Sequence, residues 1–423
     1  MKNNFKKIIN SKLFKNGMWL TILQLVNTVI PVVTIPYVTR ILGSNEYGIF
    51  SIALNWILYL QVLVEYGFGL SGSRKVALLK ENEHAQLNQL FNNIISARIL
   101  LLIVSFVALN IICIISAFSL QMYISILILF IMIIGTTFQL TWLFQGKQDM
   151  KFITIINVTS RIVSVILIFL LVKKPNDIYL YCAFYSITLF LSSVISMIVA
   201  RKKYNLKFSF ARFDAIIKEF KDGIYLFASS AMTKIFSGFG VTMLGIYTTA
   251  SITGIFSAIY KIPYVLTMFF SPVSQAIYPF ISKEFSKGDE EGKKCVRKIG
   301  IPIFIIFGIF SIFIIVFNKI IINLLFGMEY SNYSIIVVPL VIQFLLAIIN
   351  NFIGIQTLVA SGKQKNYSKA FAIGCIAIVA SNVLLGKLYG IYGVSIAAPI
   401  GELVLTISLI FQLKMLERSE KND

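Results

Sequence analysis

The chain has 423 residues, of which 57% are hydrophobic and 13% are charged, and its mean hydropathy is +0.84. A soluble domain carries about 25% charged residues, and this many apolar side chains could not all fit into one aqueous core, so the composition excludes an ordinary soluble protein. The net charge of +20 would suggest nucleic acid in a soluble protein. In a membrane protein it reflects basic cytoplasmic loops, and we expect no nucleic-acid partner.

The start of the chain is basic and is followed by a long apolar run. Five lysines precede that run, which covers about 22 residues and is longer than the apolar region of a signal peptide. It also lacks a small-x-small cleavage site. We therefore expect the first apolar run to remain in the protein as a membrane helix.

A membrane-spanning helix needs roughly 20 apolar residues, and the sequence contains twelve runs that meet this requirement. The fold class that we predict is an all-α polytopic membrane protein, with about twelve transmembrane helices in two six-helix bundles around a central cavity. The predicted spans are 18–39, 49–70, 93–117, 121–143, 152–172, 178–200, 223–247, 253–276, 299–317, 334–358, 369–386 and 391–413.

The distribution of basic residues predicts the orientation of these spans. With the N-terminus in the cytoplasm, cytoplasmic segments hold 29 of the 38 lysines and arginines, external segments hold 5, and 4 lie inside spans. Basic residues accumulate on the cytoplasmic side of membrane proteins. Because twelve is an even number, both termini are predicted to be cytoplasmic.

The segment before the seventh span is predicted to be an amphipathic helix on the inner membrane surface. Its apolar residues Phe213, Ile216, Ile217 and Phe220 recur at the spacing of one helix face, with lysines between them. A merely solvated loop is the alternative. The predicted division is an N-terminal six-helix bundle, a cytoplasmic linker helix and a C-terminal six-helix bundle, at 1–205, 206–222 and 223–423.

A weak internal repeat supports two related halves. Gly-Lys-Gln occurs at 146–148, after the fourth span, and again at 362–364, after the tenth. Gly-Ile-Phe-Ser occurs near the starts of the second and eighth spans, but also in the ninth, where a repeat does not place it. An even number of spans per half would relate the halves by an axis along the membrane normal.

Ionisable residues within the spans are the candidate functional residues, because each is costly to place in lipid. The cations Arg98, Arg161, Lys234 and Lys261 lie in both halves, and Arg40 lies at the outer mouth of the first span. Together they would line a cationic cavity that suits an anion such as a pyrophosphate, which guanidinium and ammonium groups bind by charge-assisted hydrogen bonds. The structural alternative is that these cations snorkel to the interface or join helices.

The only anions within the spans are Glu65 and Glu402. Glu65 has two candidate partners, Arg74 and Arg98, and Glu402 could pair with a cation and join helices. A proton-coupling role is the functional alternative for Glu65. The four cysteines are isolated, so we expect neither a disulfide framework nor a metal site, and no motif predicts a cofactor.

Two segments of the sequence carry a family resemblance. The first runs from Pro36-Tyr37 through Arg40, Leu42-Gly43 and Tyr47-Gly48 to Gly67-Phe68-Gly69 and Ser73-Arg74, and the second is Trp142–Gly146. They resemble the signature segments of Wzx-type bacterial polysaccharide flippases, which belong to the MATE-like multidrug/oligosaccharidyl-lipid/polysaccharide transporter superfamily. Glu65 departs from the aspartate more common in relatives but keeps the charge.

This resemblance implies a function. It implies a flippase, and not an enzyme, that moves an undecaprenyl-pyrophosphate-linked oligosaccharide repeat unit to the outer leaflet by alternating access. It also implies a multi-pass protein of the bacterial plasma membrane, with membrane lipids and polysaccharide-assembly proteins as partners. Two alternatives stay open, a MATE-like cation or drug antiporter and a membrane polysaccharide polymerase or ligase. The antiporter would need more buried carboxylates, and the polymerase or ligase a larger external loop.

Overall fold

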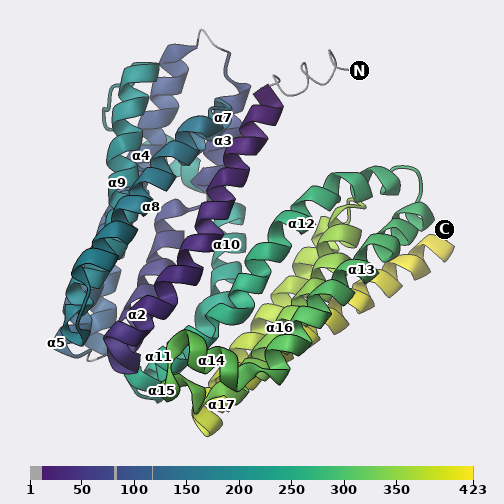
Figure 1. The fold of residues 1–423 in the computed structure, drawn as a ribbon. Helices are drawn as coiled ribbons and strands as arrows, with labels where there is room; N and C mark the ends of the chain where they lie inside the picture. Colours follow the sequence, from purple (N-terminus) through teal and green to yellow (C-terminus); the bar gives the residue numbers. More distant parts are fainter. Residues whose placement is uncertain (1–11, 81–82, 117, 423) are drawn as a thin grey trace, which may run out of the picture. The chain divides into compact units, whose positions relative to one another are not determined.

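The computed structural model describes residues 12–80, 83–116 and 118–422, and most of the basic N-terminal lead lies outside this range (Figure 1). Regular structure in the described residues is helical throughout. The helices are α2 (Lys12–Glu65), α3 (Phe68–Leu78), α4 (His84–Ile115), α5 (Leu120–Leu129), α6 (Ile131–Phe138), α7 (Thr141–Gly146), α8 (Met150–Leu171), η1 (Pro175–Asp177), α9 (Ile178–Tyr204), α10 (Phe213–Tyr247), α11 (Ala250–Ile259), α12 (Lys261–Phe285), α13 (Asp289–Val316), α14 (Asn318–Phe326), α15 (Met328–Ser331), η2 (Ser334–Ile336), α16 (Val337–Asn350), the π-helical η3 (Asn351–Val359) and α17 (Gln364–Asn422).

The described residues contain 10 helical stretches that are long and apolar enough to cross a membrane. The first and last, Lys15–Leu78 and Gln364–Arg418, have 64 and 55 residues. At 1.5 Å per residue each would be about 80–100 Å long if straight, far more than the roughly 30 Å of hydrocarbon. Each contains one glycine outside helical geometry, Gly43 (φ 73°) and Gly390 (φ 53°), so each supplies two spans. The predicted all-α polytopic fold is confirmed. The twelve predicted spans lie within these stretches or extend at most two residues beyond their ends, and residue 117, the predicted end of the third span, lies outside the described residues.

The helices form two compact units, and each is described by itself. The N-terminal unit consists of the described residues up to Thr34 together with Ala53–Lys234, and the C-terminal unit consists of Ile35–Ile52 and the residues from Ile235 onward. The chain therefore passes from one unit to the other within α2 and within α10. The division into bundles drawn from the sequence stays a prediction.

In the N-terminal unit, α9 is the helix that the others pack around. It contacts α5, α6 and α8, and α4 in turn contacts α6 (Figure 1). At Gly135 of α6 a Cβ atom would lie 2.6 Å from the backbone carbon of Leu189, so only glycine lets α6 and α9 approach this closely. In the C-terminal unit, α12, α13 and α16 contact one another, and α16 also contacts α17.

The segments that carry the family resemblance are sites of close backbone packing. Gly48 of α2 lies against α11, where a Cβ atom would lie 1.8 Å from the carbonyl oxygen of Ala250. Gly72 of α3 lies under the ring of Trp142 of α7, with a Cβ contact of 2.9 Å, and the ring is 1% exposed. At Gly146 of α7 a Cβ atom would lie 2.7 Å from the carbonyl oxygen of Ser73, so this glycine also lets the two segments approach closely. The two segments, distant in sequence, therefore meet between α3 and α7.

The amphipathic linker helix, predicted at 206–222, begins later in the structure and continues beyond its predicted end. Residues 205–212 are not helical, and α10 starts at Phe213 and continues without a break to Tyr247. The expected apolar face is also divided, because Ile216 is buried whereas Phe213 and Ile217 are 65% and 36% exposed. The linker and the seventh predicted span are thus one helix.

We expect Gly48→Ala to destabilise the folded protein. The new methyl group would overlap backbone atoms of Ala250, which cannot move aside as a side chain can, and such overpacking costs roughly 1–3 kcal/mol or more. The measurement is thermal unfolding of the purified protein in detergent. Gly308→Ala is the matched control, because nothing lies within 4 Å of its added Cβ, and it should lose no stability. Equal melting temperatures for the two variants would contradict the close contact of α2 and α11.

Candidate functional site

Arg98 is buried at the interruption between α6 and α7. The side chain, on α4, is 4% exposed, and its Nη1 donates to the carbonyl oxygens of Thr136 (3.2 Å) and Gln139 (2.8 Å). Where a helix ends, its last carbonyls have no partner in the helix, and in a membrane no water replaces that partner. The guanidinium therefore caps an interrupted helix, a structural role that charge alone did not predict.

A network of uncharged polar side chains surrounds the same interruption. The Gln139 amide donates to the Asn157 Oδ1 of α8 (3.2 Å) and to the Ser192 Oγ of α9 (3.0 Å), and Ser192 also donates to Asn157 (3.3 Å). The Ser196 Oγ accepts from the Leu140 N–H (3.4 Å). The sequence analysis missed these residues, because it considered only charged groups within spans; the available signal was the recurrence of serine along α9.

Arg161 is the candidate cation with the most unused hydrogen-bonding capacity. It is half-buried on α8, and its Nη1 donates to the Asn27 Oδ1 of α2 (2.6 Å). A guanidinium has five N–H donors, and within the described chain this side chain has no other hydrogen-bond partner. The remaining donors could bind an anion.

The two lysine candidates are also half-buried. Lys234 lies at the end of the α10 portion that belongs to the N-terminal unit. Lys261 lies on α12 in the C-terminal unit, with its Nζ 5.3 Å from the centre of the Tyr264 ring, which is the geometry of a cation–π contact. The predicted cationic cavity that these groups would line together stays a prediction.

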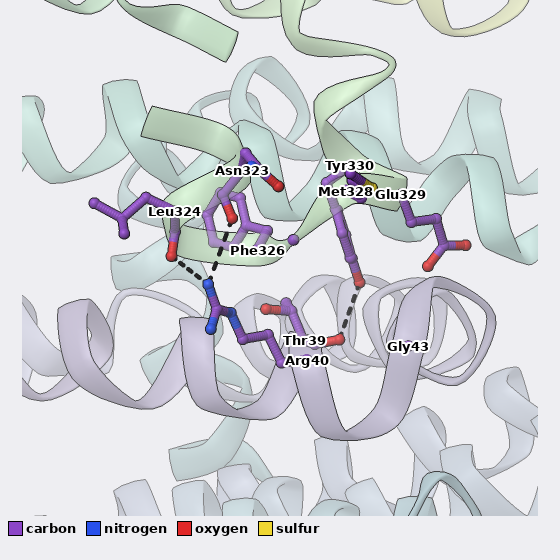
Figure 2. Close-up of a pocket in the computed structure, with 10 residues that line it drawn as sticks. Thr39, Arg40, Gly43, Asn323, Leu324, Phe326, Met328, Glu329 and Tyr330 are labelled. Atoms are coloured by element: carbon purple, nitrogen blue, oxygen red, sulfur yellow. Dashed lines mark hydrogen bonds between the residues drawn. The ribbon is translucent and has the colours of Figure 1, made fainter. Parts of the chain in front are cut away.

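Arg40 caps a second helix end, within the C-terminal unit. The side chain is exposed, and it donates to the carbonyl oxygens of Leu325 (3.2 Å), Asn323 (3.4 Å) and Leu324 at the C-terminus of α14 (Figure 2). A cation at this end also interacts favourably with the helix dipole. The segment between the ninth and tenth predicted spans thus contains two short helices, α14 and α15, which α2 contacts.

These contacts surround a pocket of about 560 Å³. It is formed by Thr39, Arg40 and Gly43 of α2 and by residues 323, 324 and 326–330 of the α14–α15 hairpin (Figure 2). The Tyr330 hydroxyl donates to the Thr39 carbonyl (3.3 Å). Burial raises the pKa of Tyr330 above its ordinary value, so the hydroxyl stays protonated and remains a donor. Sequence reasoning missed the pocket, because its two walls are nearly 300 residues apart.

Beside the pocket, Ser44 links three segments of the C-terminal unit. Its Oγ donates to the Glu329 carboxylate of α15 and lies 2.5 Å from the Ser251 Oγ of α11. We call these contacts, with those of Arg40 and Tyr330, the outer latch. It holds α2 against α11, α14 and α15.

The two candidate anions have different surroundings. Glu65 is exposed and accepts from the Gln61 amide (3.1 Å); it interacts electrostatically with Arg98, but no described cation lies within 4 Å of its carboxylate. Glu402 of α17 is 6% exposed and accepts from the Asn350 amide of α16 (2.7 Å), while Thr406 donates to the other end of that amide (2.7 Å). In this structure Glu402 joins two helices through an amide and not through a cation.

Asn351, the residue after Asn350, begins the π-helical segment η3, and its side chain contacts α12. Asn351 accepts from the Ser274 hydroxyl of α12 (2.9 Å), and the fully buried Gln356 donates to the Ser274 carbonyl (2.9 Å). π-Helical turns are often found at functional sites. Two adjacent asparagines therefore connect α16 and η3 to α17 and α12.

Residues 13–285 match the family described as "Polysaccharide biosynthesis protein". The chain is 26% identical over 369 residues to a "Putative O-antigen transporter" of Escherichia coli (strain K12), covering 86% of this chain and 88% of the relative. It is 27% identical over 407 residues to a protein of the same description from Shigella dysenteriae, covering 95% of this chain and all of the relative.

Solved structures share the fold at low sequence identity. An inward-facing multidrug resistance MATE family transporter of the MOP superfamily has a TM-score of 0.69 at 13% identity, covering 93% of this chain and 96% of that one. The lipid II flippase MurJ has a TM-score of 0.68 at 16% identity, covering 95% of this chain and 87% of that one. The architecture is therefore that of these transporters.

We expect Arg98→Leu to destabilise the protein more than Arg161→Leu does. The first change leaves two buried backbone carbonyls unpaired, at about 1–3 kcal/mol each, whereas the second removes one hydrogen bond to a half-buried amide. The measurement is again thermal unfolding in detergent. If both variants lost the same stability, Arg98 would not have the capping role that its contacts indicate.

Proposed function

The chain belongs to the polysaccharide biosynthesis protein family, and from this premise we propose that it is a flippase for a lipid-linked oligosaccharide. Its substrate is a repeat unit on undecaprenyl pyrophosphate, which it moves from the cytoplasmic to the outer leaflet of a bacterial plasma membrane. The observation that carries the proposal is the similarity along 95% of the chain to the full length of an O-antigen transporter. Polysaccharide-assembly proteins are the proposed partners in the cell.

The cations inside the spans support an anionic head group as cargo. Arg161, Lys234 and Lys261 are half-buried in helices that cross the membrane, where an uncompensated charge is costly. A pyrophosphate would bind such cations through charge-assisted hydrogen bonds and would itself meet a lower barrier in crossing about 30 Å of hydrocarbon. Arg98 and Arg40 are proposed to act indirectly, since Arg98 binds one helix end through its Nη1 and Arg40 binds another through its Nε and Nη2.

A second candidate function is cation or drug antiport. It is favoured by the likeness of fold to a MATE transporter and by the buried carboxylate of Glu402. The excess of cations over anions in the spans favours the flippase. The similar proteins are described as transporters and flippases, so the chain is a transporter and not a polymerase or ligase.

We propose that transport occurs by alternating access and that the outer latch opens during the cycle. Residues 35–52 are joined covalently to the N-terminal unit at both ends, yet they pack against helices of the C-terminal unit. A rocking motion of the two predicted bundles, with residues 1–205 moving as one body, would have to separate Ser44 from Ser251 and Glu329. The latch is built from hydrogen bonds rather than from apolar burial, which suits a contact that forms and breaks.

In cells that produce the surface polysaccharide, we expect deletion of the gene to cause lipid-linked repeat units to accumulate in the inner leaflet and to remove polysaccharide from the surface. Wild-type protein should restore both, and Arg161→Ala and Lys234→Ala should restore neither, because the head group would lose a cationic partner. The two quantities are measured together. Rescue by both variants would reduce these cations to structural roles, and a change in drug susceptibility alone would favour the antiporter.

A cross-link through the latch tests alternating access separately. In a cysteine-free background, Ser44→Cys with Ser251→Cys should form a disulfide on oxidation, because the native hydroxyl oxygens are 2.5 Å apart. We expect oxidation to stop surface polysaccharide production and a reductant to restore it. Each single variant is the control. Undiminished production with complete cross-linking would show that the latch stays closed during transport.

A further inference from the structure

The segment before α10 is fixed to α4 by a regular set of hydrogen bonds. The backbone N–H groups of Lys207, Ser209 and Ala211 donate to the side chains of Asn88 (2.7 Å), Asn92 (3.1 Å) and Ser96 (3.0 Å). The donors are spaced by two residues, as in an extended chain, and the acceptors by four, as along one face of a helix. Residues 205–212 are therefore an ordered strap and not a loose linker.

The first turns of α10 are fixed in rotation about the helix axis. Phe220 packs on the ring of Tyr66 (centroids 5.1 Å apart), and Phe227 stacks on the same ring (4.6 Å). At Gly223 a Cβ atom would lie 2.9 Å from the Tyr66 carbonyl oxygen, so the helix lies directly on the α2–α3 bend. Because this face is held within the N-terminal unit, the opposite face of α10 has a defined direction.

Two of the acidic residues at the start of this helix are paired with a lysine. The Lys75 ammonium of α3 lies 2.7 Å from the Glu219 carboxylate and 2.8 Å from that of Asp222. Glu219 is 5% exposed, whereas the Asp222 side chain is 42% exposed. Lys75 thus offsets the charge of two carboxylates, and Asp214 is exposed 4.0 Å from Arg212.

The exposed side of the strap and of α10 combines large apolar side chains with basic ones. Phe210, Phe213 and Ile217 are 74%, 65% and 36% exposed. The basic side chains beside them are also exposed, and they are Lys207, Arg212, Lys218 and Lys221. We call this set of seven residues the basic-apolar face. Apolar groups at the acyl boundary and cations among headgroups are the two requirements for binding a charged membrane surface.

We propose that the basic-apolar face binds anionic phospholipid headgroups, with Phe210, Phe213 and Ile217 inserted at the headgroup–acyl boundary. The occupant follows from charge, because four cations lie near two exposed acids, Asp214 and Asp222, and Lys75 pairs with Asp222 and with the buried Glu219. The predicted orientation places this surface at the cytoplasmic leaflet. The surface is independent of the flippase proposal and would anchor the N-terminal unit.

The test uses the full chain in nanodiscs of phosphatidylcholine with increasing fractions of phosphatidylglycerol. A polarity-sensitive fluorophore is attached at Phe213→Cys in a background without the four native cysteines. We expect its emission to shift toward that of an apolar environment as the anionic fraction rises. With Lys207→Gln, Lys218→Gln and Lys221→Gln combined, the shift should be largely lost over the same range of phosphatidylglycerol, because each lysine near the surface strengthens binding roughly fivefold and the three together about a hundredfold.

The matched control replaces three exposed lysines on the segment around the start of α13, in Lys283→Gln, Lys294→Gln and Lys298→Gln. It removes the same charge and should respond to phosphatidylglycerol as the parent protein does. Equal weakening in the two triple variants would show a general charge effect and overturn the proposal. So would a fluorophore that stays in water at every composition, or one that is equally buried in phosphatidylcholine alone. Thermal unfolding of each variant verifies that the fold is retained.

Discussion

The structure depends on a single constraint, which is that a helix interrupted inside a membrane protein must find partners for its last carbonyl groups. Two arginines supply these partners, Arg98 at the gap between α6 and α7 and Arg40 at the end of α14. In both cases the arginine comes from a different helix and reaches carbonyls distant in sequence. The interruption and the cation are therefore one feature of the fold.

This constraint changes how the cations of the spans are interpreted. From the sequence, all five formed one class of candidate substrate ligands. In the structure, Arg40 and the Nη1 of Arg98 donate to backbone oxygens at helix ends, whereas the side chain of Arg161 donates to one amide. A charge inside a membrane protein is compensated either by the protein or by a ligand. Because Arg98 is buried at the helix end that it caps and Arg161 is only half-buried, Arg161 is the better candidate for a direct contact in the proposed flippase.

Close backbone packing explains why the resemblance to a family concentrates on glycines and aromatic residues. Gly48 lets α2 touch α11, and Gly72 accommodates Trp142. These residues shape the scaffold and contribute no charged group of their own. The polar contacts of the outer latch join segments within the C-terminal unit, and those of the strap to α4 join segments within the N-terminal unit. Each set of polar contacts therefore holds segments together inside one unit.

The sequence by itself determined the class of protein and the positions of its membrane helices. Lipid is the solvent, so an apolar run of about 20 residues identifies a span whatever its neighbours are, and the twelve predicted runs lie within helical stretches of the described residues or extend at most two residues beyond their ends. Hydropathy also separated the spans on either side of Gly43 and Gly390, but it gave no sign that the chain stays helical up to these glycines, nor that α10 continues the linker helix.

Only the tertiary structure decided what each polar residue does. The pocket between α2 and the α14–α15 hairpin, the capping by Arg98, the amide between Glu402 and α16, and the binding of two carboxylates by Lys75 all join residues far apart in the chain. Hydropathy is a local property that each segment carries alone. A hydrogen bond or an ion pair exists only once packing has selected the neighbouring helix, and that selection depends on close contacts spread over the whole chain.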